Sequence, residues 1–278
     1  MNKLGVIIAV LMLWAFNGYG QSLTLMTYNI RYDNPDDGPD NWEYRKLDMV
    51  GFITERDPVI FGIQEGMHHQ VQYLHQGLAD YQYFGVGRDD GKSKGEYCAV
   101  FYRPDQVKLL KSGTFWLSET PDEVSVGWDA ALPRICTYGL FEDTGSGKNF
   151  WVFNTHFDHR GITARTNSAS LLIDRINSIN TRQLPVILMG DFNATAEDKP
   201  IQVIKSRFSY SQDISGTPLK GPAGTVNEFK MEVQNRIIDF IFCSGFKVAS
   251  VEHVDARTRE GRNLSDHLPV VVELSNFF

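Results

Sequence analysis

The sequence predicts an α/β protein in which two packed β-sheets are covered by helices. Short apolar runs rich in β-branched and aromatic residues recur along the chain and are typical of strands, some of them buried on both faces. A few longer segments instead carry apolar residues at helical spacing. Turn-rich segments such as Asp143–Lys148 join neighbouring runs as hairpins. Many strands with hairpins among them, together with a few long helices, favour two sheets with helices outside.

The predicted elements follow one another without a repeat, a linker or a charge run that would mark a domain boundary. Residues 21–278 are therefore expected to form a single domain. The helix over Asn41–Glu55 has Trp42, Leu47, Val50 and Ile53 at helical spacing. The other expected helices are Gln70–Leu78 and Thr163–Ile179. The expected strands are Leu23–Ile30, Pro58–Gln64, Tyr81–Val86, Tyr97–Tyr102, Val107–Leu117, Arg134–Phe141, Phe150–Phe157, Pro185–Met189, Ile237–Phe242, Lys247–Val254 and Leu268–Leu274.

The composition excludes several classes of protein. Of the 278 residues, 42% are hydrophobic and 12% aromatic, which is too rich for a disordered chain and unlike a coiled coil or a collagen. The formal net charge of −7 gives no sign of the basic face with which proteins grip long nucleic acids. It does not exclude a phosphorylated substrate, because a bound metal ion can supply local positive charge.

The first twenty residues have the pattern of a secretory signal peptide. Lys3 gives a positive start, Leu4–Phe16 is an apolar run of 13 residues, and Gly18 and Gly20 suit a cleavage before Gln21. The run is short for a membrane span, so we expect an exported protein, periplasmic or extracellular, with no stable membrane span after cleavage. An uncleaved anchor is the alternative. Cleavage would remove one charged residue, Lys3, and leave 258 residues with a net charge of −8.

Polar side chains suited to catalysis or metal binding stand at the ends of predicted strands. A carboxylate or histidine next to a buried strand is costly unless it is paired, solvated or bound to metal. Any one alone is a weak signal, since loop Asp and Asn often serve turns, but together they are typical of a metallohydrolase. Carboxylates and amides suit Mg²⁺, Mn²⁺ or Ca²⁺ better than zinc. The positions are Asn29, Glu65, His156, Asp158, His159, Asp191, Asn193, Asp239, Asp266 and His267.

Read as motifs, these positions resemble the endonuclease/exonuclease/phosphatase superfamily, the fold of deoxyribonuclease I. The resemblance covers nearly the whole mature chain, from Asn29 to His267, in the order that the superfamily has. It implies a four-layer α/β sandwich, with two central, mostly antiparallel β-sheets flanked by helices and the site at one end of the sheets. The motifs are Thr-Tyr-Asn29-Ile, Gln-Glu65, Asn-Thr-His156, Gly-Asp191-Phe-Asn193, Asp239-Phe-Ile and Ser-Asp266-His267.

The resemblance implies a general base and a metal site. His267 would be the base that activates a water molecule to attack phosphorus, and Asp239 would hold its other ring nitrogen. Glu65 and Asn29 would bind the divalent cation, with Asp266 as a further ligand. The ion, Mg²⁺ or Mn²⁺ with Ca²⁺ as another fit, would polarise the phosphoryl oxygen and stabilise charge on the leaving group.

The same resemblance implies roles on the other side of the site. Asp191 and Asn193 would position water and phosphate or hold a second ion. His156 would contact the phosphate or protonate the leaving oxygen, and Glu96 matches an acid that orients this second histidine. Arg134 matches a phosphate-contacting arginine, although a structural ion pair fits it equally well.

His159 and Asp158 lie beside His156 in the sequence, where they could line the substrate-binding cleft or act as scaffold.

The function expected from these features is that of an exported, divalent-metal-dependent phosphoesterase acting on a phosphodiester or a phosphomonoester. A small phosphorylated substrate is favoured over a nucleic acid, because the chain is acidic and its lysines are scattered. A secreted nuclease acting on DNA or RNA is the first alternative. A catalytically silent binding module of the same fold is the second. The sequence indicates no protein partner.

Overall fold

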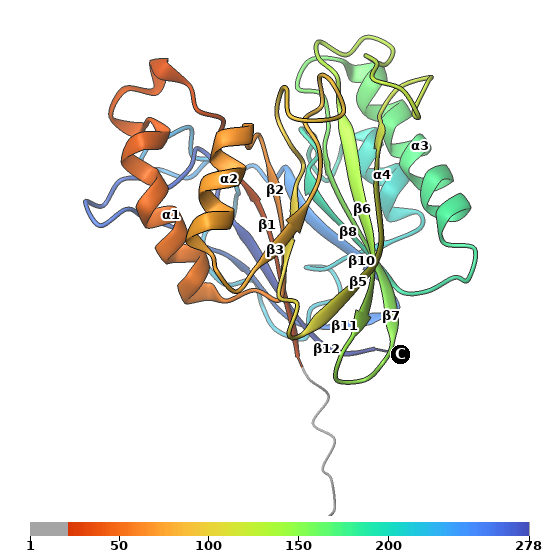
Figure 1. The fold of residues 1–278 in the computed structure, drawn as a ribbon. Helices are drawn as coiled ribbons and strands as arrows, with labels where there is room; N and C mark the ends of the chain where they lie inside the picture. The colour runs from red at the N-terminus through yellow and green to blue at the C-terminus, as the bar shows by residue number, and fades with distance from the viewer. Residues whose placement is uncertain (1–21, 278) are drawn as a thin grey trace, which may run out of the picture.

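The computed structural model describes residues 22–277, and their strands form two six-stranded sheets packed face to face. Helices lie on both outer faces, with α1 and α2 on one side and α3 and α4 on the other (Figure 1). The predicted four-layer sandwich is confirmed. The predicted signal peptide at residues 1–20 lies outside the described residues. Within the described range, no helix combines the length and apolar character needed to cross a bilayer.

The first sheet has the strand order β11-β12-β1-β2-β4-β3. Strands β1 and β2 run parallel, and every other neighbouring pair is antiparallel. Its strands are β1 (Leu23–Asn29), β2 (Ile60–Gln64), β3 (Gln82–Phe84), β4 (Val100–Tyr102), β11 (Phe246–His253) and β12 (Val270–Phe277).

The second sheet has the order β5-β6-β7-β8-β10-β9. Here β7 and β8 are the parallel pair and the rest are antiparallel, so the prediction of mostly antiparallel sheets holds for both. Its strands are β5 (Val107–Trp116), β6 (Ile135–Asp143), β7 (Asn149–His156), β8 (Val186–Asp191), β9 (Ser209–Tyr210) and β10 (Asp239–Ser244).

Three apolar layers hold the sandwich together, and alternation along the strands builds them. Successive side chains of a strand point to opposite faces. Leu25 of β1 and Val152 of β7 therefore belong to the core between the sheets. Their neighbours Met26 and Phe153 pack outward, Met26 into the layer of α1 and α2 and Phe153 into that of α3 and α4.

The predicted helices agree with the structure to within about two residues. They are α1 (Trp42–Arg56), α2 (His68–Gly77) and α3 (Ile162–Ile179). Not predicted were the 3₁₀ segment η1 (Pro35–Asp40), the helix α4 (Lys199–Lys205) and the two-residue strand β9. Each of these is too short for hydrophobic periodicity to reveal it.

The sheets direct their functional residues to one end of the molecule. Strand β1 begins near the end of the sandwich where the C-terminus lies, and it runs toward the loops at the opposite end (Figure 1). Strand β2 ends at that same side because it is parallel to β1. Strands β7 and β8 are parallel to each other and also end there, since Asn29 at the end of β1 contacts Asp191 at the end of β8.

Candidate active site

Strand register brings the polar residues together. The parallel pairing of β7 with β8 sets His156 beside Asp191, and the antiparallel pairing of β8 with β10 sets Asp191 beside Asp239. In the other sheet Asn29 ends β1, level with the residue that precedes Glu65. The Asn29 amide nitrogen donates to Glu65 Oε1 and to Asp191 Oδ2, both at 3.0 Å. A single amide thus joins the two sheets at the predicted site.

Three residues at strand exits have left-handed backbones. Arg31, Glu65 and Asn193 have φ angles of 61°, 63° and 46°. Each such non-glycine residue costs on the order of 1–3 kcal/mol, and such strain concentrates at active sites. Glu65 and Asn193 are predicted site residues, so the tight exits fall where the side chains must converge.

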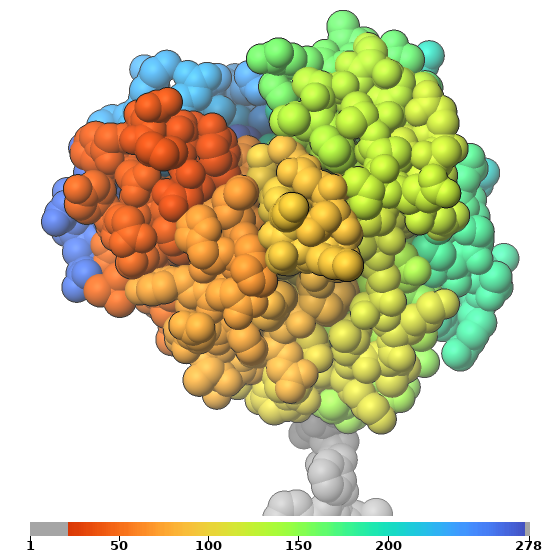
Figure 2. Space-filling model, turned by 45° about the horizontal axis from the view of Figure 1, so that its top comes forward, coloured from red at the N-terminus to blue at the C-terminus, as the bar shows by residue number. Residues whose placement is uncertain are grey.

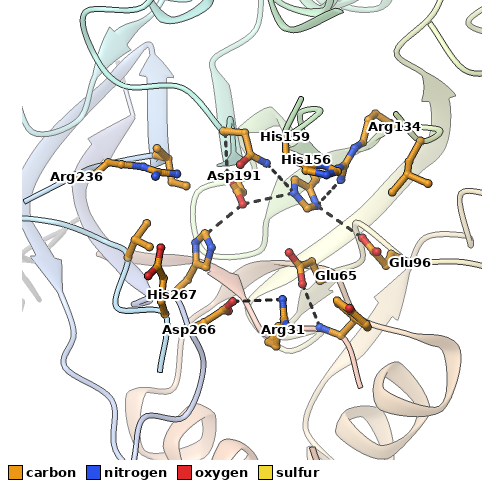
Figure 3. Close-up of a pocket in the computed structure, with 16 residues that line it drawn as sticks. Arg31, Glu65, Glu96, Arg134, His156, His159, Asp191, Arg236, Asp266 and His267 are labelled. Atoms are coloured by element: carbon orange, nitrogen blue, oxygen red, sulfur yellow. Dashed lines mark hydrogen bonds and ion pairs between the residues drawn. The ribbon is translucent and has the colours of Figure 1, made fainter. Parts of the chain in front are cut away.

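The converging side chains line a cavity of about 460 Å³ at this end of the molecule. Figure 2, turned to bring this end forward, shows a hollow between the red and blue segments and the green ones. Figure 3 shows the residues around it, with Asp191 between His267 and His156. The lining residues are Arg31, Tyr32, Glu65, Glu96, Leu132, Arg134, His156, His159, Asp191, Asn193, Val226, Glu228, Arg236, Ile238, Asp266 and His267.

His267 and Asp239 form the pair predicted for a general base. His267 Nδ1 lies 2.9 Å from Asp239 Oδ2, and both residues are buried. Burial alone would lower the pKa of His267, but the carboxylates of Asp239, Asp191 and Asp266 raise it well above its ordinary value. With Nδ1 held by Asp239, the Nε2 atom is the one left to exchange a proton with water.

His156 Nδ1 lies closer to an arginine than to Glu96, the acid predicted to orient it. Arg134 Nη1 lies 3.1 Å from His156 Nδ1, whereas Glu96 Oε2 is 3.9 Å away and accepts instead from Arg88 Nη1 at 2.6 Å. Burial and the Arg134 charge lower the pKa of His156 well below its ordinary value. A guanidinium can only donate, so neutral His156 would accept at Nδ1 and carry its proton on Nε2, 3.5 Å from Asp191 Oδ2. The Asn193 amide nitrogen also lies 3.1 Å from Nε2, but in that tautomer it can donate only to the Phe157 carbonyl.

The position of Arg134 is compatible with both roles considered for it. It lines the cavity, yet its Nε lies 3.3 Å from Asp158 Oδ2 and its Nη2 2.9 Å from His159 Nδ1. Asp158 also accepts the backbone N–H groups of Arg160 and Gly161. Asp158 is therefore scaffold behind the arginine and does not line the cavity, while His159 does.

The acidic residues of the site fit a hard divalent cation. Ligand atoms of Glu65, His156 and Asp191 lie within 4.8 Å of one another, and so do those of Asp191, Asp239 and His267. Asp239 Oδ1 is buried without a hydrogen-bond partner. Burial, and then the charge of Asp239, raise the pKa of Asp191 to about 7. The hydrogen bonds to Asp191 do not offset its burial beside Asp239, and an oxygen-rich donor set of this kind suits Mg²⁺ or Mn²⁺.

The three predicted ligands all have protein partners. Asn29 turns its amide nitrogen toward the carboxylates, while its Oδ1 accepts from the Arg31 backbone N–H at 3.0 Å. Asp266 lines the cavity with its Oδ2 3.5 Å from Arg31 Nη1. Glu65 also has partners, since it accepts from the Asn29 amide and from the Tyr32 backbone N–H. Its carboxylate nevertheless lies with His156 and Asp191 in a group of possible ligand atoms, which makes it the predicted ligand best placed for a cation.

Sequence reasoning missed three charged residues of the cavity, Arg31, Glu228 and Arg236. Arg31 follows β1 in a tight turn, with a φ of 61° and its backbone N–H donating to Asn29 Oδ1, so strand alternation gives no signal for it. Glu228 and Arg236 lie in a loop before β10 with no motif around them. Only the folded loop brings them to the cavity.

Comparison with known proteins agrees with this fold and site. The model of the Endonuclease/Exonuclease/phosphatase family matches residues 26–267. The chain belongs to this family, whose members are hydrolases acting on phosphoester bonds.

Individual relatives share its architecture to different extents. The mannosyl-6-phosphatase Bt3783 of Bacteroides thetaiotaomicron is 39% identical, with a TM-score of 0.87 over 91% of this chain and 99% of that one. An uncharacterized protein of Acanthamoeba polyphaga mimivirus, L388, is 30% identical over 55% of this chain and 59% of its own. The CCR4-Not complex 3'-5'-exoribonuclease subunit Ccr4 of Mycosarcoma maydis is 22% identical over 64% of this chain and 34% of its own. The chain thus spans well under two thirds of these last two proteins.

Proposed function

We propose that this protein is an exported, divalent-metal-dependent phosphoesterase that hydrolyses a small phosphorylated molecule. The observation that carries the proposal is the buried His267–Asp239 pair, at 2.9 Å, beside a cavity lined by Glu65, Asp191 and Asp266. A histidine base whose ring is held by an acid, beside a cation site, can activate a water molecule to attack a phosphate ester.

The proposed reaction gives one proton-transfer role to His267 and another to His156. His267 Nε2 accepts a proton as water oxygen bonds to phosphorus, and Asp239 stabilises the resulting imidazolium. The bond from phosphorus to the leaving oxygen breaks, and His156, which carries its proton on Nε2, is placed to contact the phosphate or to protonate that oxygen. When bound, the cation would be held by Glu65 with Asp191, and it would supply charge stabilisation for the phosphoryl and leaving oxygens.

A phosphorylated carbohydrate is the first substrate class to test. Its support is the likeness to the mannosyl-6-phosphatase, which covers almost the whole of both chains. The cavity of about 460 Å³ is also the size of a small-molecule site. The net charge of −7 supports a small substrate over a long polyanion.

A nuclease is the second candidate, supported by the match to the exoribonuclease subunit Ccr4. A silent binding module has less support, because the base, its acid and the acidic cluster are all present and close together. Export has its support in the pattern of residues 1–20. N-terminal sequencing of the protein from the culture medium or the periplasm, with Gln21 as the first residue, would test it.

A substrate panel at fixed Mg²⁺ concentration tests the function. We expect phosphosugars to be hydrolysed faster than nucleotides, phospholipids, RNA or DNA, with His267→Ala as the background control. Faster cleavage of DNA or RNA would replace the proposal by the nuclease. Failure to cleave any member above the His267→Ala background would favour the silent module.

A further inference from the structure

Three arginines line the cavity, and two of them are committed to protein partners. Arg31 donates through Nε and Nη2 to both oxygens of Asp37, at 2.9 and 2.8 Å, and its Nη1 lies 3.5 Å from Asp266. Arg134 has a partner at each of its three nitrogens. These two guanidinium groups are therefore fixed in place by the protein itself.

Arg236 differs from both. Its side chain has no hydrogen bond and no ion pair with any residue in the range 22–277, and yet it lines the cavity. The pKa of Glu228 is lowered mainly by the hydrogen bond from Lys230, 2.7 Å away, with which its carboxylate is paired, and the charge of Arg236 helps to lower it. In Figure 3 it enters from the side of His267, across the cavity from Arg134 and Glu96. A free guanidinium with five donors thus stands at the site of the proposed reaction.

The loop that carries Arg236 is tied by its backbone to the catalytic segment. The N–H of Thr225 donates to the Arg236 carbonyl at 2.9 Å, and the Thr225 carbonyl accepts from Leu268 N–H at 2.7 Å. The N–H of Asn227 donates to the Asp266 carbonyl at 2.9 Å. The backbone of Arg236 is thus held in register with His267, so the reach of its side chain toward the cavity is built into the fold.

We propose that Arg236 binds a terminal phosphate oxygen that a monoester presents and a diester does not, which makes it the residue that selects phosphomonoesters. This inference rests on the proposed function. A phosphate bound between His267 and His156 would have oxygens to present to the cation site, to the Arg134 side and to the Arg236 side, because these groups line the same cavity. In a diester one of those oxygens carries the second substituent and cannot pair with a guanidinium.

Charge and geometry both favour this assignment. A phosphomonoester has a second pKa of about 6 and is mostly a dianion at neutral pH, whereas a diester has a single charge. Arginine forms two parallel charge-assisted hydrogen bonds with phosphate, which neither lysine nor glutamine can copy. The acidic cluster beside the cavity would otherwise oppose a dianion, so an uncommitted arginine gives the monoester a distinct advantage.

The test compares Arg236→Gln with wild type on 4-nitrophenyl phosphate and bis(4-nitrophenyl) phosphate at saturating Mg²⁺. We expect kcat/KM for the monoester to fall by about 10- to 100-fold, the range for charge-assisted hydrogen bonds, and that for the diester to change less than about 3-fold. Arg182→Gln is the matched control. Arg182 is also exposed and unpaired within the described residues, but it precedes β8, at the end of that strand opposite Asp191.

Calorimetric titration of inorganic phosphate, in the presence of Mg²⁺, measures the same contact without turnover. The dissociation constant should rise by about 10-fold or more in Arg236→Gln and stay unchanged in Arg182→Gln. Equal losses on both esters, or unchanged phosphate binding, would overturn the role of Arg236. If wild type cleaved neither ester, the proposed function would fail, while phosphate binding would still decide the assignment of Arg236.

Discussion

The two walls of the cavity handle charge in opposite ways. On the arginine wall every guanidinium nitrogen of Arg134 has a protein partner, and Asp158 is satisfied by backbone N–H groups. On the acidic wall Asp239 Oδ1 has none, and burial, with the charge of a neighbouring carboxylate, raises the pKa values of Asp191 and Asp266. The arginine wall is Arg134, His156 and His159, with Asp158 behind them, and the acidic wall is Glu65, Asp191, Asp266 and His267, with Asp239 behind the histidine.

The difference indicates which parts of the site the protein completes by itself. The arginine wall needs no ligand to hold its geometry, so it can meet substrate already ordered. The acidic wall concentrates negative charge that would repel a phosphate, and a cation would reverse the local sign. The comparison therefore predicts that the two walls respond differently to metal removal and to substitution.

Removal of metal should have the largest effect, because the acidic wall depends on it. Chelation should lower phosphoester hydrolysis by at least about 10³-fold, since a catalytic cation contributes several kcal/mol to the transition state. Excess Mg²⁺ or Mn²⁺ should restore the rate, measured as phosphate release. Unchanged hydrolysis in chelator would show that the acidic wall works without a cation.

Loss of the general base His267 should have the second largest effect on activity. His267→Ala is expected to lower kcat by about 10²- to 10⁴-fold, the usual contribution of a general base. His69→Ala is the control, because His69 is an exposed histidine that does not line the cavity. Circular dichroism should show both variants folded. A fully active His267→Ala would assign water activation to another group.

The sequence placed several site residues correctly because strand register positions them, while the resemblance to the superfamily supplied their expected roles. Asn29, Asp191 and Asp239 lie at the ends of apolar strands, and their positions in the sheets follow from where those strands begin and end. A pattern of apolar runs and their polar ends contains this information. Pairing between strands then converts it into contacts.

The contacts of the arginine wall and the position of Arg236 could not be predicted from the sequence, because they depend on loop conformation. The motif led us to pair Glu96 with His156. In the structure Arg134 is the nearer neighbour of His156 Nδ1, and the Glu96 carboxylate accepts a hydrogen bond from Arg88. Arg236 stands in a loop whose path depends on backbone bonds to residues 266 and 268. Such long-range contacts leave no periodic trace in the sequence.

Thermal unfolding should report the metal dependence of the acidic wall without catalysis. A cation at 100 times its dissociation constant stabilises the folded state by about 2.7 kcal/mol, which raises Tm by about 5–10 °C in a protein of this size. Glu65→Gln should lose most of this shift. Glu123→Gln, at an exposed acid away from the cavity, should keep it. An equal shift in both variants would move the cation away from Glu65.

The smallest expected effect separates the two candidate partners of His156. A double-mutant cycle on kcat/KM, with Arg134→Ala and His156→Ala, should give a coupling of about 0.5–3 kcal/mol, as for residues in direct contact. The same cycle with Glu96→Gln in place of Arg134→Ala should give a smaller value, because the closest approach of Glu96 to the ring is 3.9 Å and its hydrogen bond is to Arg88. A stronger coupling to Glu96 would mean that the acid orients the ring during turnover. The arginine wall would then require substrate to complete it, as the acidic wall requires metal.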